Sequence, residues 1–490
     1  MAQTGEAKPE MLDTGVPNLD LVLGGGLRRH NSYLIVGPPG VGKSVLNQQI
    51  AFHRAKRGDR VLFITGLDEP HQNLIEHMRT FRFADIALIG PQIETVSVVP
   101  FLARPVDEKI DVLRQTVLNA RPQFVTLDGL RSFEAFVGGR QGLYHFLYGL
   151  TSWFAVEGIT LLLTRDTDSP AVQDNPETSL VDGVLLLRRD LVDGHSRRRL
   201  WVCKMRGQKP LDGLHPFTID ADGVAVWPRP QATFRLEERP WSQARLAFGI
   251  PSLDPMLGGG LPEMTSTLLA GDPGAGKTVL ALAFLNDGVR QGQRGLWLGF
   301  RETRARLPIA GKQWSSDLAE AQGQGQVAFL TLAPFELEPS LVAARLRDQV
   351  AELGARRLVL DAAEVLEQAF PSQPDAEHFL RWLVEALPQQ GVTTLVTRRV
   401  PRMPWQEFAV PGLPFISLVD NVILVRQLER RGQLRRAVAV IKMSSPGYDM
   451  ATREFTLDQY GVTVGEPVST EIEAVQPALR ASNEPVRGPI

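Results

Sequence analysis

Two stretches of the chain place a lysine and a hydroxyl side chain directly after a glycine-rich loop. The first is Gly37-Pro38-Pro39-Gly40-Val41-Gly42-Lys43-Ser44, and the second is Gly271-Asp272-Pro273-Gly274-Ala275-Gly276-Lys277-Thr278. Both fit the pattern G-x-x-x-x-G-K-[ST], in which the loop cradles a phosphate chain, the lysine reaches the β- and γ-phosphates and the hydroxyl ligates Mg²⁺. The sequence therefore predicts two sites for ATP and Mg²⁺, with Ser44 and Thr278 as metal ligands.

Such a site also needs an acidic residue at the end of a neighbouring strand, where it holds the magnesium through water. Asp128 follows the apolar run at 124–127, and Asp361 follows the run at 357–360. An aspartate in this place also occurs as a helix cap, so the position downstream of a phosphate loop is what favours the metal role. We expect Asp128 and Asp361 to complete the two magnesium sites.

Hydrolysis of ATP further requires a carboxylate that orients or deprotonates the attacking water. The candidates lie just after the second predicted strand of each half, and they are Asp68, Glu69 and Glu302. The alternative role for these residues is that of solvated acids at a helix start.

The elements that must position these residues alternate between apolar strands and helices. In the first half the pattern predicts strands at 33–36, 61–65, 124–127 and 160–164 and helices at 45–57, 72–79 and 106–119. Continuous apolar strands separated by helices indicate a parallel sheet that is covered on both faces. Short strands separated by Asp-Gly turns then follow at 184–188, 198–204, 217–220 and 224–227. They predict antiparallel hairpins at the sheet edge.

The second half of the chain repeats the first. Gly15 to Asp20 returns as Gly249 to Asp254, and the two phosphate loops are separated by the same number of positions. Corresponding strands are predicted at 266–270, 295–299, 357–360, 393–397, 421–426 and 435–442. The chain is therefore interpreted as a tandem duplication. The expected organisation is a flexible N-terminus at 1–10, a first domain at 11–228, a linker at 229–245, a second domain at 246–465 and a disordered tail at 466–490.

Composition excludes several classes of protein. The 490 residues carry a formal net charge of −2, which gives no basic field to favour nucleic acid or an anionic membrane. No apolar run approaches the ~18 residues that span a bilayer, so a cytoplasmic protein is expected. The one cysteine, Cys203, allows no internal disulfide and is interpreted as a strand residue rather than a nucleophile.

The doubled module and its hairpin sequences resemble the KaiC family of circadian clock ATPases and their RecA-like relatives. The similar stretches in the first half include Val181-Asp182-Gly183-Val184, Arg197-Arg198-Arg199, Lys204-Met205-Arg206-Gly207 and His215 to Ile219. Those in the second half are Val419 to Leu424, Arg435-Arg436-Ala437, Lys442-Met443 and Arg453-Glu454-Phe455.

This resemblance extends from about Gly15 to Val464. It implies an α/β fold of two tandem RecA-like P-loop domains, each a mostly parallel sheet flanked by helices with antiparallel hairpins at the edge. It further implies a double-ring homo-hexamer with ATP between subunits, ATPase activity in the first ring, Ser/Thr autokinase and autophosphatase activity in the second, and clock-type or signalling partners.

The chain departs from the family after the second strand, where the family has a Glu-Glu pair. Aligned without gaps, this chain has Leu67-Asp68 and Arg301-Glu302, so the first acid of each pair is missing. A shift by one residue would make Asp68-Glu69 the pair in the first half. Hydrolysis is expected to be slow, or to depend on Asp68 and Glu302.

A second departure concerns residues that contact the neighbouring subunit's nucleotide in the family. Lys204 and Arg206 match both positions in the first half, whereas the second half keeps only Lys442 and has Ser444 in place of the arginine. In the absence of the resemblance, these basic residues would be interpreted as solvated strand faces.

A third departure concerns the phosphorylation site. Only Ser417 remains of the family's Ser-Thr pair in the second half, and the first half has Thr178-Ser179 at the corresponding place. Ser417 is thus a candidate phosphoacceptor, with an ordinary buried or capping serine as the alternative. Thr164 and Thr397 end strands beside the expected γ-phosphate and are candidate sensors of it.

Three functional hypotheses follow. The leading one is a ring-forming KaiC-like ATPase that acts as a timer or signalling switch. A RecA-like DNA-handling motor shares the same nucleotide site, but the near-neutral charge disfavours it. A non-catalytic, nucleotide-gated scaffold is favoured by Leu67, Arg301 and Ser444.

Overall fold

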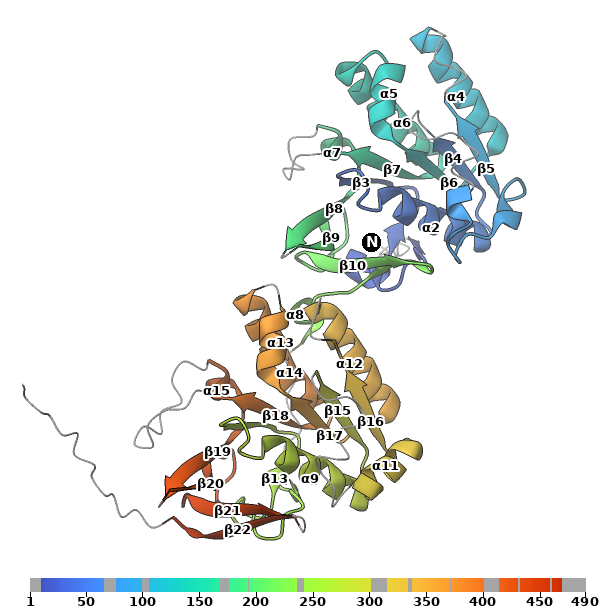
Figure 1. Cartoon of the computed structure of the whole chain (residues 1–490). Helices are drawn as coiled ribbons and strands as arrows, with labels where there is room; N and C mark the ends of the chain where they lie inside the picture. Colours follow the sequence, from blue (N-terminus) through green and yellow to red (C-terminus); the bar gives the residue numbers. More distant parts are fainter. Residues whose placement is uncertain are drawn as a thin grey trace, which may run out of the picture. The chain divides into compact units, whose positions relative to one another are not determined.

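The computed structural model describes residues 10–65, 76–98, 105–167, 176–192, 194–235, 242–300, 315–333, 337–370, 372–400, 414–430, 432–458 and 461–468. They form two compact units, each of which contains one nine-stranded sheet (Figure 1). The first unit comprises 1–239, 332–354 and 364–389, and the second comprises 240–331, 355–363 and 390–490. Of the flexible N-terminus predicted at 1–10 and the disordered tail predicted at 466–490, residues 1–9 and 469–490 lie outside the described residues, whereas Glu466 and Pro467 belong to the strand β22 (Gly461–Pro467).

The first sheet has the strand order β11-β10-β9-β8-β3-β7-β6-β4-β5. Its strands are β3 (Ser32–Gly37), β4 (Val61–Thr65), β5 (Ile93–Ser97), β6 (Phe124–Asp128), β7 (Thr160–Asp166), β8 (Gly183–Val192), β9 (His195–Met205), β10 (His215–Asp220) and β11 (Gly223–Val226). The strands from β8 to β5 in this order are parallel, and β9 to β11 continue the sheet as antiparallel hairpins. The strand that leads into the first phosphate loop therefore lies in the middle of the sheet.

Helices cover both faces of this parallel part. Helix α2 (Lys43–Lys56) lies on one face, and α4 (Val106–Ala120), α5 (Leu130–Phe136) and α6 (Arg140–Glu157) lie on the other (Figure 1). Successive strand residues alternate between the two cores, so Ile35 packs with Leu46 of α2 while Leu34 packs with Leu147 of α6. The shorter elements of this half are β1 (Met11–Leu12), α1 (Leu19–Leu23), β2 (Leu27–Arg28), η1 (Ile86–Leu88), α7 (Glu177–Leu180) and α8 (Pro230–Thr233).

The second sheet repeats the design with the order β16-β15-β17-β18-β14-β19-β20-β21-β22. Its strands are β14 (Ser266–Gly271), β15 (Gly295–Gly299), β16 (Val327–Thr331), β17 (Arg357–Asp361), β18 (Thr393–Arg399), β19 (Asn421–Arg430), β20 (Gln433–Lys442), β21 (Arg453–Asp458) and β22 (Gly461–Pro467). The other elements are β12 (Arg245–Leu246), β13 (Leu261–Pro262), α9 (Lys277–Arg290), α11 (Ser315–Gly323), α12 (Pro339–Leu353), α13 (Ala363–Ala369), α14 (Gln373–Gln389) and α15 (Pro414–Leu418).

The predicted fold class is confirmed: each half has a mostly parallel sheet, flanking helices and antiparallel strands at one edge. The prediction named neither β5 nor β16, which form the opposite edges. The short helix α8 lies within the segment 229–245 that was predicted to be a linker, and β12 begins at the last residue of that segment.

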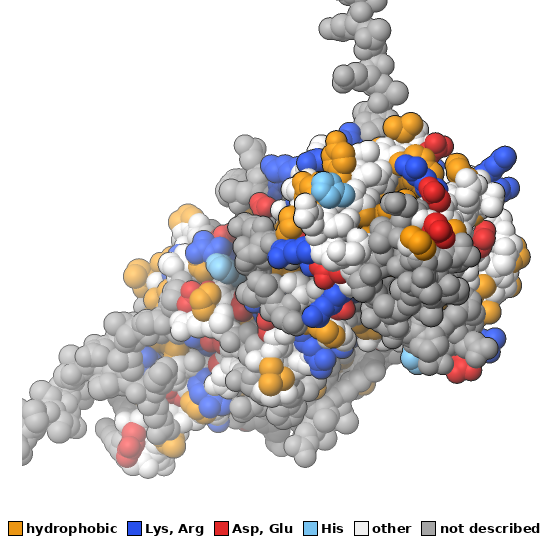
Figure 2. All heavy atoms as spheres, turned by 90° about the horizontal axis from the view of Figure 1, so that it is seen from above, with side chains coloured by type: hydrophobic (Ala, Val, Ile, Leu, Met, Phe, Trp, Pro, Cys, Tyr) orange, Lys and Arg blue, Asp and Glu red, His pale blue; other side chains and the backbone are white. Residues whose placement is uncertain are grey.

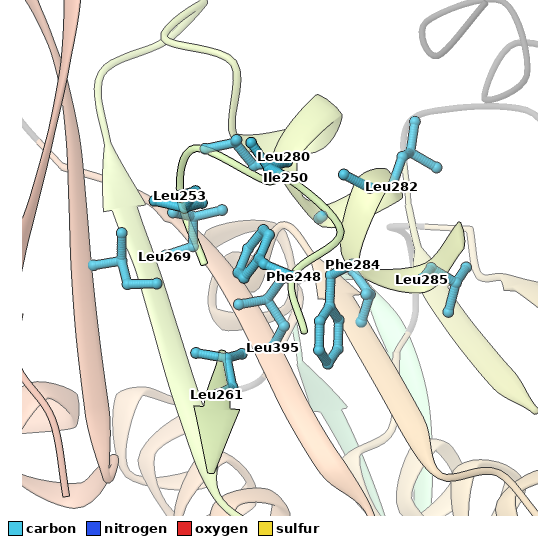
Figure 3. Close-up of a cluster of buried hydrophobic side chains, with 14 of the residues drawn as sticks. Phe248, Ile250, Leu253, Leu261, Leu269, Leu280, Leu282, Phe284, Leu285 and Leu395 are labelled. Carbon is cyan, nitrogen blue, oxygen red and sulfur yellow. The ribbon is translucent and has the colours of Figure 1, made fainter. Parts of the chain in front are cut away.

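The core between α9 and the second sheet is mainly aliphatic and aromatic. Figure 3 shows Phe248, Leu269, Phe284 and Leu395 converging from the loop, the strands and the helix. The sequence explains this packing because α9 carries a continuous apolar run at 279–285 and β14 is apolar at its centre, at Leu268, Leu269 and Ala270.

An arginine is completely buried beside this core. Arg357 begins β17, and its guanidinium donates to Gln293 Oε1 at 2.7 Å, to the carbonyl oxygens of Ala247 and Phe284 at 2.8 and 2.6 Å, and to Asp287 Oδ2 at 3.0 Å. Four of the five N–H donors of the planar guanidinium therefore have acceptors. The equivalent first residue of β6 is Phe124, so the first half has an apolar aromatic residue where the second half has a charged one.

Both edge hairpins contain a β-bulge at the corresponding place. The extra residue is Cys203 in β9, directly before Lys204, and Ile441 in β20, directly before Lys442. Burial raises the pKa of the Cys203 thiol to about 11, so the thiol stays protonated near neutral pH. This agrees with a strand residue rather than a nucleophile.

A charged cluster fixes the N-terminal segment to α2. Asp13 is bound by His53 at 2.8 Å, by Arg54 at 2.6 Å and by Arg57 at 2.9 Å. Burial acts to raise the pKa of Asp13, but hydrogen bonds and charge from His53 and Arg57 outweigh it and lower the pKa to about 2.

Candidate nucleotide-binding sites

The first phosphate loop joins the carboxyl end of β3 to the first residue of α2. Gly42 is the residue before the helix, and its φ of 115° is a left-handed conformation that favours glycine. A Cβ atom at Gly42 would also lie 2.4 Å from Ile219 Cδ1. The loop thus presents the N-terminus of a helix of 14 residues to any ligand above the sheet, and such a terminus favours phosphate.

A cavity of about 560 Å³ opens at this helix terminus. It brings together Lys43, Ser44 and Asp128, three of the residues that the sequence predicted for the site. Its full lining is Pro39, Gly40, Gly42, Lys43, Ser44, Val45, Thr65, Asp128, Gly129, Thr164, Asp166, Arg198 and Ile219.

The residues predicted to hold magnesium fit that role. Ser44 and Thr164 both hydrogen-bond to the Asp128 carboxylate, which gathers hydroxyl and carboxylate oxygens at one point of the cavity. Burial raises the pKa of Asp128, and the hydrogen bonds from Thr164 and Ser44 and the charge of Lys43 oppose that rise. Oxygen ligands of this kind are the ones Mg²⁺ takes at phosphate-binding sites.

Thr164 also accepts a hydrogen bond from the backbone N–H of Gly129 at 2.9 Å. It therefore links the end of β7 to the end of β6 and orients Asp128. Its predicted role as a phosphate sensor stays a prediction.

Lys43 is 8% exposed and uses three partners in the structure. Its ammonium donates to the carbonyl oxygens of Gly37 and Pro38 at 3.0 and 2.9 Å and to Asp166 Oδ1 at 2.6 Å. The carbonyl bonds hold the lysine over its own loop, where it can reach a phosphate chain. The bond to Asp166 was not anticipated.

The second phosphate loop has the same backbone. Lys277 donates to the carbonyl oxygens of Gly271 and Asp272 at 3.0 and 2.8 Å, and Thr278 donates to Asp361 Oδ2 at 3.1 Å. Thr397 also donates to Asp361 and so repeats the contact made by Thr164. The magnesium ligands predicted for this half are thus adjacent as well.

The two sites differ at the strand beside the loop. Asp166 lies opposite Gly37 in the β3–β7 register, and Arg399 lies opposite Gly271 in the β14–β18 register. The last residues of β7 and β18, which occupy equivalent positions, therefore carry opposite charges.

The predicted interface residues lie on the edge hairpins. Lys204 donates to the carbonyl oxygens of Thr178 and Val181 at 2.8 and 2.7 Å, and Arg206 lies 3.4 Å from Asp182. Neither basic residue is among the described residues that line the first cavity.

The second half keeps only part of this arrangement. Lys442 donates to the carbonyl oxygen of Val419 at 2.7 Å, which repeats the bond between Lys204 and Val181. Ser444 hydrogen-bonds to Asn421 Oδ1 and has no charge to offer a neighbour.

The structure describes only some of the remaining predicted residues. Asp68, Glu69 and Glu302 lie outside the described residues. Ser417 lies on α15 with an exposed side chain, which removes the alternative of a buried serine.

Sequence reasoning missed six residues of the first cavity, which are Val45, Thr65, Gly129, Asp166, Arg198 and Ile219. Asp166 had a usable signal, because it ends a strand whose carboxyl edge carries the site. Arg198 and Ile219 lie on the hairpin strands β9 and β10, and only the pairing of those strands brings them over the loop.

Two phosphate loops at the carboxyl ends of parallel strands, each with an adjacent hydroxyl and carboxylate, define a protein with two tandem RecA-like P-loop domains. The chain belongs to the KaiC ATPase family, whose model matches residues 12–231 and again residues 246–469.

Individual relatives cover nearly the whole chain. A circadian clock protein KaiC3 of Synechocystis sp. is 27% identical, with 97% of this chain and 96% of the relative aligned. A circadian clock oscillator protein KaiC of Picosynechococcus sp. is 25% identical over 93% of this chain and 89% of the relative. Within the described part of the chain, no helix has the length and apolar character needed to cross a membrane.

Proposed function

We propose that this chain is a KaiC-like ATPase that binds Mg-ATP at both phosphate loops and hydrolyses it mainly at the first. The observation that carries the proposal is the convergence of Lys43, Ser44 and Asp128 on one cavity at the N-terminus of α2. This arrangement supplies a phosphate-binding cation, an anion-binding helix end and a metal-binding pair within a single site.

Each side chain has a distinct task in this proposal. Lys43 binds the β- and γ-phosphates, and Ser44 and Asp128 hold Mg²⁺, which neutralises charge on the phosphates when it is bound. Asp68, with Glu69 as the alternative, orients the attacking water at the first site. Glu302 has that task at the second.

We further propose a homo-hexameric ring in the cytoplasm, with nucleotide between adjacent subunits, that acts as a regulatory timer or signalling switch. Lys204 and Arg206 would then contact the neighbour's nucleotide, as an arginine finger does. The second half offers only Lys442 for this purpose, so turnover there is expected to be slower. Clock-type or signalling proteins are the expected partners.

The described residues on the face that Figure 2 shows do not favour a DNA-handling motor. In Figure 2, basic and acidic side chains are interspersed over the face in view, and the net charge of the chain is −2. Nucleic acid would require a continuous basic patch.

ATP turnover by the purified full-length chain tests the proposal. Lys43→Ala is expected to remove most of the turnover and Lys277→Ala a smaller part. Lys209→Ala, an exposed lysine on the same half, is the matched control and should behave as the wild type. If the variant that lacks both loop lysines hydrolyses ATP as fast as the wild type, the proposal is wrong. If the wild-type protein binds ATP at both loops but does not hydrolyse it, the chain is a nucleotide-gated scaffold.

The finer assignments have their own tests. Asp68→Asn should slow turnover in the Lys277→Ala protein, and unchanged turnover would reject Asp68 as the catalytic carboxylate. Sedimentation or electron microscopy with ATP should show a hexamer, whereas a monomer would exclude the interface role of Lys204 and Arg206. Labelled ATP should modify the wild type but not Ser417→Ala if Ser417 is the phosphoacceptor.

A further inference from the structure

The first phosphate loop contains an ion pair that the ATPase proposal does not use. Asp166 Oδ1 lies 2.6 Å from Lys43 Nζ, and both residues line the same cavity. A lysine ammonium has three donors. In the structure these donors meet the carbonyl oxygens of Gly37 and Pro38 and the carboxylate of Asp166.

The carbonyl partners belong to the loop itself and stay in place when a phosphate chain enters. The Asp166 carboxylate is different, because it is an anion on the cavity side of the lysine. A phosphate oxygen that approaches Lys43 has to replace this carboxylate as the third acceptor. It also meets the repulsion of a second negative charge.

The position of Asp166 allows such a replacement. It is the last residue of β7, and its side chain is 26% exposed, whereas Lys43 is 8% exposed. The carboxylate can therefore move into water at little cost, while the lysine stays fixed by its carbonyl bonds.

The second half has no carboxylate at the position of Asp166. Arg399 occupies the register position of Asp166, opposite Gly271. The two loops share their glycines, their lysine, a hydroxyl residue and an aspartate at the end of the neighbouring strand, so this position is one charge difference between them. A second is Asp272, which stands where the first loop has Pro38, but it is 2% exposed and accepts a hydrogen bond from the backbone N–H of Gln427.

We propose that Asp166 competes with nucleotide phosphate for Lys43 and thereby lowers the nucleotide affinity of the first loop relative to the second. The inference rests on the proposed nucleotide binding at that loop. It assigns Asp166 the role of a residue that sets affinity, and it assigns no step of hydrolysis to it.

Equilibrium binding of ADP and ATP by calorimetry tests this inference. All proteins carry Lys277→Ala, which leaves the first loop as the site observed. Asp166→Asn keeps the shape of the side chain and removes its charge. It is expected to lower the Kd about three- to tenfold for both nucleotides, with and without Mg²⁺, since a partly exposed ion pair is opposed by screening.

Two further variants separate charge from packing. Asp166→Glu keeps the carboxylate and should stay within about twofold of the parent, since the competitor remains. Asp222→Asn removes a carboxylate that pairs with Arg82 and is 69% exposed, and it should leave the Kd unchanged. Thermal melts establish that each protein is folded.

Three results would overturn the inference. An unchanged Kd in Asp166→Asn would show no competition, and a raised Kd would show that Asp166 prepares Lys43 for binding. A Kd raised only with Mg²⁺ would make Asp166 a metal-binding residue.

Lys43→Ala distinguishes failure of the inference from failure of the proposed function. If the Lys277→Ala protein binds nucleotide and Lys43→Ala abolishes this binding, the function stands whatever Asp166→Asn shows. If the Lys277→Ala protein binds no nucleotide, both fall.

Discussion

Replacement of the buried Arg357 by methionine is expected to destabilise the second core selectively. Methionine keeps an unbranched stem against Phe284 and Gly288 but removes the guanidinium. The Asp287 carboxylate and the carbonyl oxygens of Ala247 and Phe284 then lose their donors. Breaking a buried ion pair costs about 3–5 kcal/mol. Because the Asp287 side chain is 17% exposed and retains access to water, we expect the lower end, about 3 kcal/mol.

Hydrogen exchange followed by mass spectrometry measures this loss locally. A change of about 3 kcal/mol corresponds to roughly hundredfold faster exchange of the protected amides. Peptides from α9 should show it, while peptides from α2 serve as the internal control, since the first core has Phe124 in place of Arg357. The variant Arg357→Met/Asp287→Leu removes both charges and should recover much of the protection. Exchange in α9 less than about fivefold faster, or equally faster in α2, would refute the reasoning.

Three further predictions concern the first half. Asp13→Asn should lower the free energy of unfolding by about 1 kcal/mol at neutral pH, discounted because Asp13 is 37% exposed. Since folding lowers this pKa from 3.8 to about 2, the difference should vanish as the pH falls through that interval in denaturation experiments, and a constant difference would contradict it. Thr164→Val should reduce first-site turnover about five- to tenfold by removing a donor to Asp128, and wild-type rates would reject the orienting role. Gly37→Ala should abolish nucleotide binding at the first loop, because the new Cβ lies 2.4 Å from the Leu187 carbonyl oxygen, and normal binding in a titration would disprove this.

Much of the fold was predictable because the two halves of the chain repeat the same pattern of strands and helices. The strand at 61–65 matches β4 to the residue, and the loop at 37–44 could be placed because a strand, a glycine-rich turn and a helix follow one another. The positions of these elements follow from the order of residue types within each short segment. The positions of Asp128 and Asp361, the predicted magnesium ligands, could be placed for the same reason, since each ends a mainly apolar strand.

What escaped prediction depends on contacts between distant segments. Arg357 has the appearance of a polar residue before an apolar strand, and nothing local indicates that Asp287 and two carbonyl oxygens will enclose it. Asp166 gains its significance only through its register opposite Gly37. The catalytic carboxylates predicted at Asp68, Glu69 and Glu302 remain predictions, since they lie outside the described residues.

The paired β-bulges bear on the history of the chain. An extra residue reverses the alternation of a strand, so Lys204 lies on the opposite face of β9 from Arg198, which lines the nucleotide cavity. The same insertion precedes Lys442 in β20. A feature shared by both copies is most simply dated to the ancestral single module. The contrasts between Asp166 and Arg399 and between Arg206 and Ser444 then arose after duplication. In this order of events, both halves kept the backbone of the ancestral module and later came to differ in the charged residues at the ends of their strands.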